Sequence, residues 1–279
     1  MRSRFFTGLG KAGFHRLHYT EWGDPAAPAV VCVHGLTQNA RTFDALAAAL
    51  APTRRVICLD VAGRGRSDRL ADPMGYDYPQ YLADVNTLFA RLDVGTLDFV
   101  GTSMGGIIGM LLAALPGHPI GRLVVNDVGP FIPKAALARI RDYIGHDFRY
   151  ADLAGLEAHM RKAYAPFGPL TDAQWRKLAE DAALTNADGS ISQGYDPAIA
   201  IPIKAQPLAD VDLWPFWDRV SCPVLLLRGA ESDLLHAGTA AEMQKRGPPT
   251  TLVEFAGIGH APVLFDAGQI EPVRAFLAA

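Results

Sequence analysis

The fold of this chain is decided by the stretch TLDFVGTSMGGIIGMLLAAL, residues 96–115. A strand-like run, TLDFV, leads into a Gly-rich turn, and a helix-like run, IIGMLLAAL, follows the turn. The turn has the pattern Gly-x-Ser-x-Gly, in which Gly101 and Gly105 let a strand and a helix cross without colliding side chains. Such a turn lifts the hydroxyl of Ser103 above the C-terminal edge of a sheet, where open α/β sheets bind ligands. The context predicts a nucleophilic serine rather than an ordinary Gly-rich turn.

Short apolar runs alternate with helical patterns on both sides of this stretch. The runs that we expect to be strands are residues 29–35, 54–61, 96–103, 122–129, 223–229 and 251–257. They are nearly continuous in Val, Leu and Ile, as is typical of parallel strands that are covered on both faces. Segments between them place apolar residues on one helical face, such as Leu82, Val85, Phe89 and Leu92. The pattern predicts an open α/β sheet, with an antiparallel hairpin in the first segment.

The alternation stops between Phe131 and Pro215. This segment contains helix-like stretches, no convincing strand, and many aromatic residues. We therefore expect residues 131–215 to form a helical cap, or lid, inserted into a core built from residues 1–130 and 216–279; ordinary packing helices are the alternative. At the end of the cap, Trp214 and Trp217 are candidate substrate-binding residues in an apolar pocket, although both could equally be part of a packed core.

Composition and charge exclude several classes of protein. The chain has 26 basic and 29 acidic residues and no basic stripe, which argues against a nucleic-acid partner. Its three cysteines lie in strand-like runs without Cys-x-x-Cys spacing, so we expect buried free thiols and no disulfide framework or metal site. The N-terminus has no apolar signal segment, and the apolar part of the central helix, residues 107–115, is too short to span a membrane. A cytoplasmic location is the expectation.

A serine nucleophile needs a base and an acid that orients the base. His260 is the best candidate base, because it follows the last strand-like run in a Gly-rich loop, AGIGHAP. For the acid we expect Asp233, which follows the penultimate strand in the sequence RGAESD. Asp127, which lies after an earlier strand in NDVG, is the alternative, since both loops reach the same edge of the sheet.

Taken together, these motifs resemble those of the α/β-hydrolase superfamily. The resemblance rests on His34-Gly35, on Asp60-x-x-Gly63-x-Gly65-x-Ser67-Asp68, on the Gly101–Gly106 turn, on Gly229-x-x-Ser232-Asp233 and on Gly259-His260. It implies a mostly parallel eight-stranded sheet with helices on both faces and a cap, and the catalytic order Ser103, Asp233, His260. It also implies an oxyanion hole formed by the backbone N–H groups of Leu36 and Met104, supported by His34. No metal or organic cofactor is expected.

The resemblance limits the reaction more than the substrate. We expect an enzyme, a carboxylesterase-like hydrolase, that cleaves a small to medium carboxylic ester or lactone through an acyl-enzyme. Dehalogenases and most epoxide hydrolases of this superfamily use an aspartate nucleophile, which Ser103 disfavours. Carbon–carbon bond hydrolases of ring-cleavage diketones share the Ser-x-Met-Gly-Gly turn but usually have a Gly-rich oxyanion loop, where this chain has Leu36-Thr37-Gln38-Asn39. They remain an alternative, as does a non-catalytic ligand receptor; thioesterases, amidases and haloperoxidases share the triad.

Overall fold

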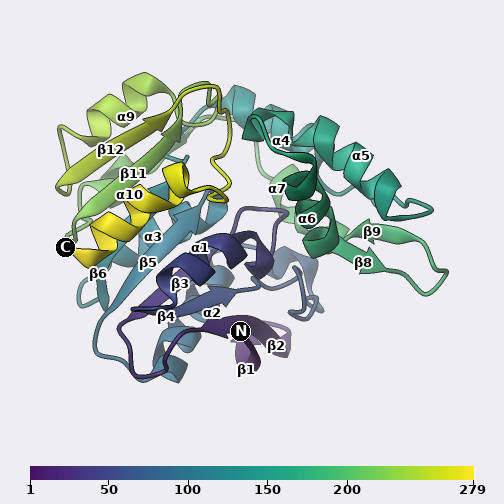
Figure 1. Ribbon diagram of the computed structural model, residues 1–279, viewed down its shortest axis with the longest axis horizontal. Helices are drawn as coiled ribbons and strands as arrows, with labels where there is room; N and C mark the ends of the chain where they lie inside the picture. Colours follow the sequence, from purple (N-terminus) through teal and green to yellow (C-terminus); the bar gives the residue numbers. More distant parts are fainter.

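The computed structural model describes all residues, 1–279, and contains one large twisted sheet (Figure 1). Its eight strands run in the order β1-β2-β4-β3-β5-β6-β11-β12. The first strands, β1 and β2, form an antiparallel hairpin, and β2 joins β4 antiparallel, whereas all pairs from β4 to β12 are parallel. The strands are β1 (Arg2–Gly10), β2 (Gly13–Trp22), β3 (Ala29–Val33), β4 (Arg55–Leu59), β5 (Leu97–Thr102), β6 (Ile120–Asn126), β11 (Val224–Gly229) and β12 (Thr250–Phe255). The predicted mostly parallel, eight-stranded sheet is confirmed.

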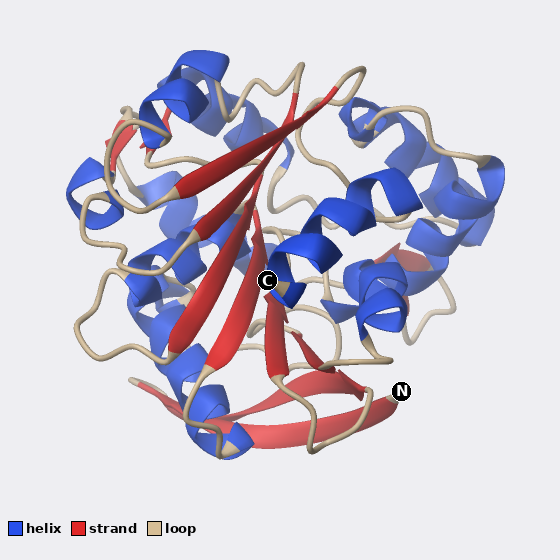
Figure 2. Cartoon of the chain, turned by 60° about the vertical axis from the view of Figure 1, so that its left-hand side comes forward, coloured by secondary structure: helices blue, strands red, loops and turns tan.

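Helices cover both faces of the sheet (Figure 2). These are α1 (Asp44–Leu50), preceded by the 3₁₀ turn η1 (Ala40–Phe43), then η2 (Pro73–Gly75), α2 (Tyr78–Leu92), α3 (Met104–Ala113), α9 (Ala237–Met243) and α10 (Ala267–Ala278). Alternate residues of each strand point to opposite faces. In β3, Val30 and Cys32 pack with α1 and α10, whereas Val31 and Val33 pack with α2 and α3. Both faces of the central strands are therefore shielded from water, which explains their continuous apolar runs.

All three cysteines are buried and free, as predicted. Burial raises the pKa of the Cys222 thiol to about 11 and the pKa of Cys58 well above its usual range. Both thiols are therefore protonated at neutral pH and behave as small apolar side chains. None of the helices has the length and apolar character that a membrane span requires.

Residues 131–215 lie together beside the sheet, in green and teal in Figure 1. They form β7 (Phe131–Ile132), α4 (Lys134–Tyr143), α5 (Leu153–Ala163), η3 (Ala165–Phe167), α6 (Asp172–Ala182), β8 (Ala183–Thr185), β9 (Ile191–Gln193), η4 (Pro197–Ile199), α7 (Ala200–Ala205) and β10 (Val211–Asp212), and α8 (Trp214–Trp217) leads back to the sheet. The segment is mainly helical, but the expectation of no strands was wrong. β7 pairs with β10 where the segment leaves and re-enters the sheet, and β8 pairs with β9 in a hairpin.

This segment contacts the loops at the C-terminal ends of the parallel strands. Gly65, after β4, donates its backbone N–H to Gly194 O, and Asn39, after β3, donates its side-chain N–H to Asp181 O. Loops after parallel strands carry the site in open α/β sheets. Residues 131–215 therefore lie over the edge of the sheet where Ser103 emerges.

The turn between β5 and α3 is strained and crowded. Ser103 has φ 53° and ψ −115°, a conformation that costs about 1–3 kcal/mol for a non-glycine residue. A Cβ on Gly105 would lie 1.9 Å from the carbonyl oxygen of Val33, and one on Gly101 would lie 2.3 Å from Gly105 O. The two glycines are needed because α3 crosses the ends of β3 and β5 at backbone contact.

We predict that Gly105→Ala lowers the free energy of unfolding by about 3 kcal/mol or more, because the new methyl group meets backbone that has no room to move. Gly238→Ala is the matched control, since a Cβ there meets nothing within 4 Å. In helix α9 that change leaves stability equal or raises it by up to about 1 kcal/mol. Urea unfolding of both variants measures the difference, and equal stabilities would contradict the crossing described here.

Candidate active site

Three side chains form a continuous hydrogen-bonded chain at the C-terminal edge of the sheet. Ser103 Oγ lies 2.9 Å from His260 Nε2, and His260 Nδ1 lies 2.8 Å from Asp127 Oδ2. Ser103 follows β5, Asp127 follows β6, and His260 lies in the loop after β12. The Asp127 side chain is fully buried, while the His260 side chain is 16% exposed. This arrangement allows the histidine to accept the serine proton while the carboxylate holds the opposite ring nitrogen.

Asp127 is fixed by donors from the loop after β11. Its Oδ1 accepts the backbone N–H of Gly229 at 2.8 Å, and its Oδ2 accepts the hydroxyl of Ser232 at 2.7 Å in addition to the His260 ring. The backbone of Asp127 is left-handed, with φ 56°, and its N–H donates to Leu227 O. Donors therefore fix both oxygens of the Asp127 carboxylate in a site that has no exposure to water.

The predicted contact between Asp233 and His260 is not formed, so that prediction was wrong. Asp233 is 52% exposed and forms a bidentate ion pair with Arg139 of α4, at 2.6 and 3.0 Å. Its neighbour Ser232 points inward, because the hydroxyl binds Asp127 and accepts the N–H groups of Leu234 and Leu235. The next side chain is therefore directed outward. Asp127, the alternative from the sequence, is the carboxylate that the structure brings to His260.

Hydrogen bonds on two sides anchor the loop that carries His260, and the sequence pattern does not predict them. Asn126 Nδ2 donates to Pro262 O at 2.8 Å, and it also bonds Thr102 Oγ1. On the other side, the N–H of Gly259 donates to Pro166 O of η3 at 2.6 Å. The ring of His260 is therefore positioned by contacts from β6 and from residues 131–215 together.

The peptide between Gly35 and Leu36 is held in one orientation. Its carbonyl, Gly35 O, accepts His34 Nδ1–H at 2.7 Å and the backbone N–H of Gln38 at 3.2 Å. Because a peptide is planar and trans, the N–H of Leu36 points to the opposite side and finds no partner within the protein. Gly35 borders Ser103, since a Cβ built on it would lie 3.6 Å from Ser103 Cβ.

Met104, the second predicted oxyanion residue, is the first residue of α3. The N–H of a first helical residue has no partner inside its helix, and it lies at the positive end of the helix dipole. The structure thus places two free backbone donors close to Ser103: the N–H of Leu36 in the loop after β3 and the N–H of Met104 at the start of α3. A negatively charged oxygen formed beside Ser103 is the group that such donors stabilise.

His34 is neutral in the folded protein. It is fully buried, and burial lowers its pKa to about 4. Its Nε2 accepts the N–H of Val61 at 3.1 Å, which fixes the proton on Nδ1 and makes Nδ1 the donor to Gly35 O. The residue predicted to support the oxyanion loop does so through a defined tautomer.

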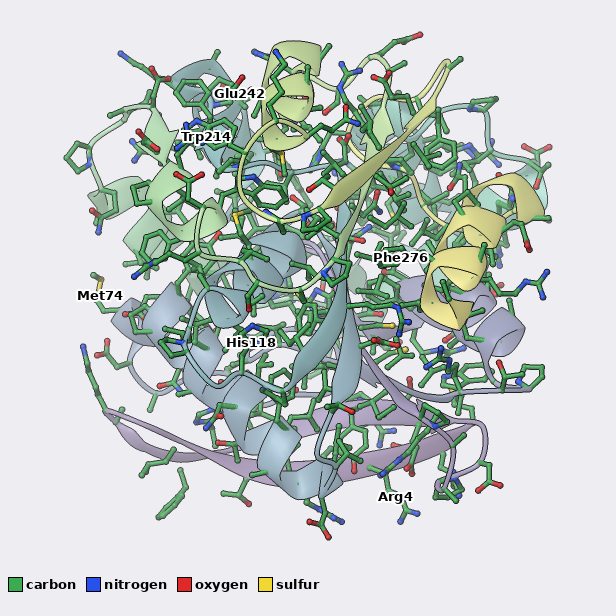
Figure 3. All side chains as sticks on the ribbon, turned by 90° about the vertical axis from the view of Figure 1, so that its left-hand side faces the viewer. Arg4, Met74, His118, Trp214, Glu242 and Phe276 are labelled. Atoms are coloured by element: carbon green, nitrogen blue, oxygen red, sulfur yellow. The ribbon has the colours of Figure 1, made fainter.

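The two tryptophans predicted as substrate-binding residues lie elsewhere. Trp217 is completely buried, and its indole N–H donates to Arg246 O at 2.9 Å. Trp214 lies at the periphery (Figure 3), where the guanidinium of Arg246 stacks 4.7 Å from its ring centroid. Neither ring hydrogen-bonds to Ser103, Asp127 or His260. Trp217 is a packing residue, and Trp214 packs against Arg246 at the end of the inserted segment.

Polar groups of residues 131–215 lie directly against the oxyanion loop. Tyr164 Oη is 3.0 Å from Thr37 Oγ1 and accepts Gln193 Nε2–H at 2.6 Å. Gln193 Nε2 also lies 3.1 Å from Thr37 O. The Tyr164 ring stacks on Phe167 at 4.9 Å, nearly parallel. The loop that carries Leu36 is therefore covered by a hydrogen-bonded tyrosine and glutamine.

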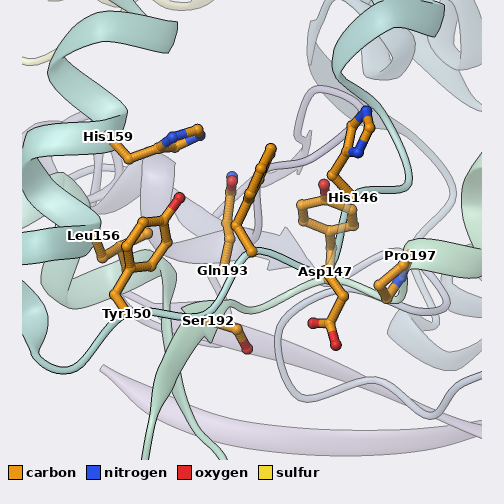
Figure 4. Close-up of a pocket in the computed structure, with 10 residues that line it drawn as sticks. His146, Asp147, Tyr150, Leu156, His159, Ser192, Gln193 and Pro197 are labelled. Carbon is orange, nitrogen blue, oxygen red and sulfur yellow. The ribbon is translucent and has the colours of Figure 1, made fainter.

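Gln193 also borders a small cavity of about 10 Å³, room for about one water molecule, between α5 and β9 (Figure 4). The cavity is lined by His146, His159 and Tyr150, whose hydroxyl is buried without a partner. A larger cavity, of about 540 Å³, lies between the tip of the β1–β2 hairpin and the start of α2. Ser103, Asp127 and His260 are not among the residues that line this larger cavity.

The sequence matches the family model described as "Alpha/beta hydrolase family" over residues 30–276. The chain belongs to the alpha/beta hydrolase family. It is 46% identical to the 3-hydroxybutyrate-oligomer hydrolase of Cupriavidus necator, over 96% of this chain and 95% of the relative. Among solved structures it resembles a putative hydrolase from Rickettsia typhi, with TM-score 0.93, 33% identity, and 100% and 99% of the two chains covered. It also resembles an alpha/beta hydrolase from Novosphingobium aromaticivorans, with TM-score 0.89, 37% identity, and 99% and 98% covered.

The chain is therefore an enzyme of the hydrolase class, as predicted, and its similarity to an ester-cleaving relative supports ester hydrolysis. The hydrogen-bonded chain Ser103–His260–Asp127, at the C-terminal edge of the sheet, has the geometry for that chemistry.

Exchanging each candidate carboxylate separately tests the assignment of Asp127. Asp127→Asn is expected to lower kcat by about 10⁴, because an amide leaves the His260 ring in the wrong tautomer and leaves its cationic form without a counter-charge. Asp233→Asn is the matched control: it breaks only an exposed ion pair, so kcat is expected to change by less than about threefold. Steady-state kinetics with a p-nitrophenyl ester give both values. The reverse ranking would return the role to Asp233.

The neutral, buried His34 predicts a specific dependence of stability on pH. Its folded pKa, about 4, lies below the ordinary value of 6.5, so the unfolded chain binds the proton more readily between these values. The stabilisation is complete above pH 6.5 and is lost as the pH falls toward 4, by about 3 kcal/mol in all.

Urea unfolding of the wild type and of His34→Asn at pH 7.5, 6, 5 and 4 isolates this contribution. The stability advantage of the wild type over the variant is expected to shrink steadily as the pH falls. His15, whose pKa the Asp84 carboxylate raises, titrates in both proteins and cancels in the difference. An advantage that stays constant or grows in acid would show that His34 is charged in the folded protein.

Proposed function

We propose that this enzyme hydrolyses the ester bonds of short 3-hydroxybutyrate oligomers, with Ser103 as nucleophile, His260 as general base and acid, and Asp127 as the orienting carboxylate. The observation that carries the reaction type is the hydrogen-bonded chain Ser103–His260–Asp127 beside two free backbone donors. The substrate class rests on 46% identity, over nearly the whole length, to a relative with that named activity.

The first half of the reaction forms an acyl-enzyme. Ser103 Oγ attacks the ester carbonyl carbon while His260 Nε2 accepts the hydroxyl proton, and the carbonyl oxygen becomes an oxyanion. The N–H groups of Leu36 and Met104 stabilise that oxyanion, each donor contributing about 3 kcal/mol by analogy with similar sites. When the tetrahedral intermediate collapses, the C–O bond of the leaving alcohol breaks and His260 returns the proton to that alcohol.

The second half releases the acid. Water enters the place of the departed alcohol, gives a proton to His260 Nε2 and attacks the acyl carbon. A second oxyanion forms in the same site, and its collapse returns Ser103 Oγ with its proton. In an oligomer the leaving alcohol is the 3-hydroxyl group of the next unit, so each cycle shortens the chain at one ester and produces one carboxylate and one hydroxyl end.

Asp127 contributes by compensating charge rather than by accepting a proton. The imidazolium of His260 forms during the reaction next to the Asp127 carboxylate, which Gly229 and Ser232 hold in place. A charge that is in place before the reaction needs no reorganisation when the cation forms. The buried position of Asp127 makes this interaction stronger than it would be in water.

We predict that the wild-type enzyme converts the linear dimer and trimer of 3-hydroxybutyrate to monomer and that Ser103→Ala lowers kcat by several orders of magnitude, because the members of a triad act as a unit. Ser221→Ala, at an exposed surface serine, is the control and retains full activity. Chromatographic detection of the monomer and the thermal midpoint of each variant are the measurements.

A fluorophosphonate probe identifies the nucleophile independently of the substrate. The adduct is expected on the peptide that contains residues 101–106, and only when Ser103 is present. An adduct on another serine would contradict the mechanism. Rapid cleavage of a p-nitrophenyl ester without any cleavage of the oligomers would keep the mechanism and reject the proposed substrate.

A further inference from the structure

Arg64 is a buried cation without a counter-ion. It lies in the turn after β4, its relative exposure is 1%, and no carboxylate lies within ion-pair distance of its guanidinium. An arginine side chain stays protonated in proteins, so the charge is present in the folded state. Burying an unpaired charge costs several kcal/mol. A charge kept at that cost needs an explanation.

The hydrogen-bond partners of the Arg64 guanidinium point to the reason why this charge is kept. Nε donates to Leu36 O at 2.9 Å, and Nη2 lies 3.7 Å from the sulfur of Met104. These are the two residues whose N–H groups form the oxyanion hole. Nη1 donates to Ala62 O at 2.7 Å and lies 3.0 Å from Tyr81 Oη, so the other end of the group is anchored in the core.

The aromatic rings of Tyr76 and Tyr81 exclude water from Arg64 and interact favourably with its positive charge. The guanidinium carbon lies 5.3 Å from the centroid of the Tyr81 ring and 5.7 Å from that of Tyr76. Aromatic faces attract cations without neutralising them. The guanidinium therefore keeps its positive charge without a direct ion pair, and the low polarity of its surroundings extends the effect of that charge to nearby groups.

The backbone of Arg64 joins the same site to the inserted segment. Arg64 forms an isolated β-bridge with Tyr195, and the next residue, Gly65, donates its N–H to Gly194 O. The loop after β4 thus lies between residues 131–215 on one side and the oxyanion loop on the other. A displacement of Arg64 would move the carbonyl of Leu36, because Nε holds it directly.

We propose that Arg64 is a positioning residue of the oxyanion hole. Its guanidinium fixes the loop at Leu36 against the start of α3 at Met104, and its positive charge stabilises the oxyanion that these two residues face. The inference rests on the proposed function, since it concerns the same reaction. It adds a residue that does not touch the substrate and that acts on the step in which negative charge develops. The ground-state ester is neutral, so its binding gains little from the charge.

Arg64→Met tests the proposal, since methionine fills similar space without charge or donors. The expected result is a loss of about 50-fold in kcat with KM within about twofold, smaller than the effect of deleting a direct donor. The affinity for phenylboronic acid, which forms a tetrahedral anion on the serine, is expected to fall in parallel. Arg64→Lys is expected to recover about a fifth of wild-type kcat, because lysine keeps the positive charge but lacks the planar set of guanidinium donors.

Arg55→Met is the control for the loss of a half-buried, ion-paired arginine. Arg55 binds Glu21 and Leu92 O at the start of β4, the end of the strand that lies away from the site. This variant is expected to lose stability but to keep kcat within about threefold. All proteins are compared on p-nitrophenyl butyrate, with the thermal midpoint measured alongside.

A folded Arg64→Met enzyme with kcat within about fivefold of wild type would overturn the proposal, and so would a loss confined to KM. If Arg64→Met does not fold, the lysine variant decides: unchanged kcat and unchanged boronic acid affinity would overturn it. These outcomes are distinct from failure of the proposed function, which shows in the wild type as no cleavage of the oligomers or in Ser103→Ala as retained activity.

Discussion

The hydrogen bond between His260 Nδ1 and Asp127 Oδ2 connects the loops after β6 and β12, and the proposed catalysis depends on the relative position of these loops. Asp127 belongs to the end of β6 and is held by the loop after β11, and His260 belongs to the loop after β12. The distance of 2.8 Å can be met only if these strands and their loops are in register. The strained turn at Ser103 then brings the nucleophile to the other nitrogen of the same ring. The sheet supplies the rigidity that keeps this geometry before substrate arrives.

The fixed charges of this site are opposite in sign to the charges that develop next to them in the proposed reaction. In the proposed reaction, Asp127 lies behind His260, which becomes positive, and Arg64 lies behind Leu36 and Met104, which face the oxygen that becomes negative. Each fixed charge is separated from the reacting atoms by one neutral group. Both are almost completely buried, where electrostatic interactions are least screened. This polarity favours the charge separation of the tetrahedral intermediate over the neutral ester.

The sequence predicted the features that depend on local pattern. The turn at Ser103 and the loop of His260 are predictable because glycines and strand-like runs mark them, and the sheet is predictable from continuous apolar runs. The choice of the acid depended on which side chain of the loop after β11 turns inward. Ser232 does so, which directs Asp233 outward, and no periodicity reports this. Likewise the two- and three-residue strands between 131 and 215 are too short to leave a pattern, and Arg64 looked like any residue of a polar turn.

The most direct test of the account is to trap the intermediate. The wild-type enzyme is mixed with the 3-hydroxybutyrate trimer, quenched in acid within milliseconds, digested and analysed by mass spectrometry. The account predicts hydroxybutyryl units esterified to Ser103, on the peptide containing residues 101–106, at a level that falls when the substrate is exhausted. Steady turnover of the trimer with no acyl group on Ser103 at any time, together with a Ser103→Ala enzyme that still cleaves it, would contradict the account.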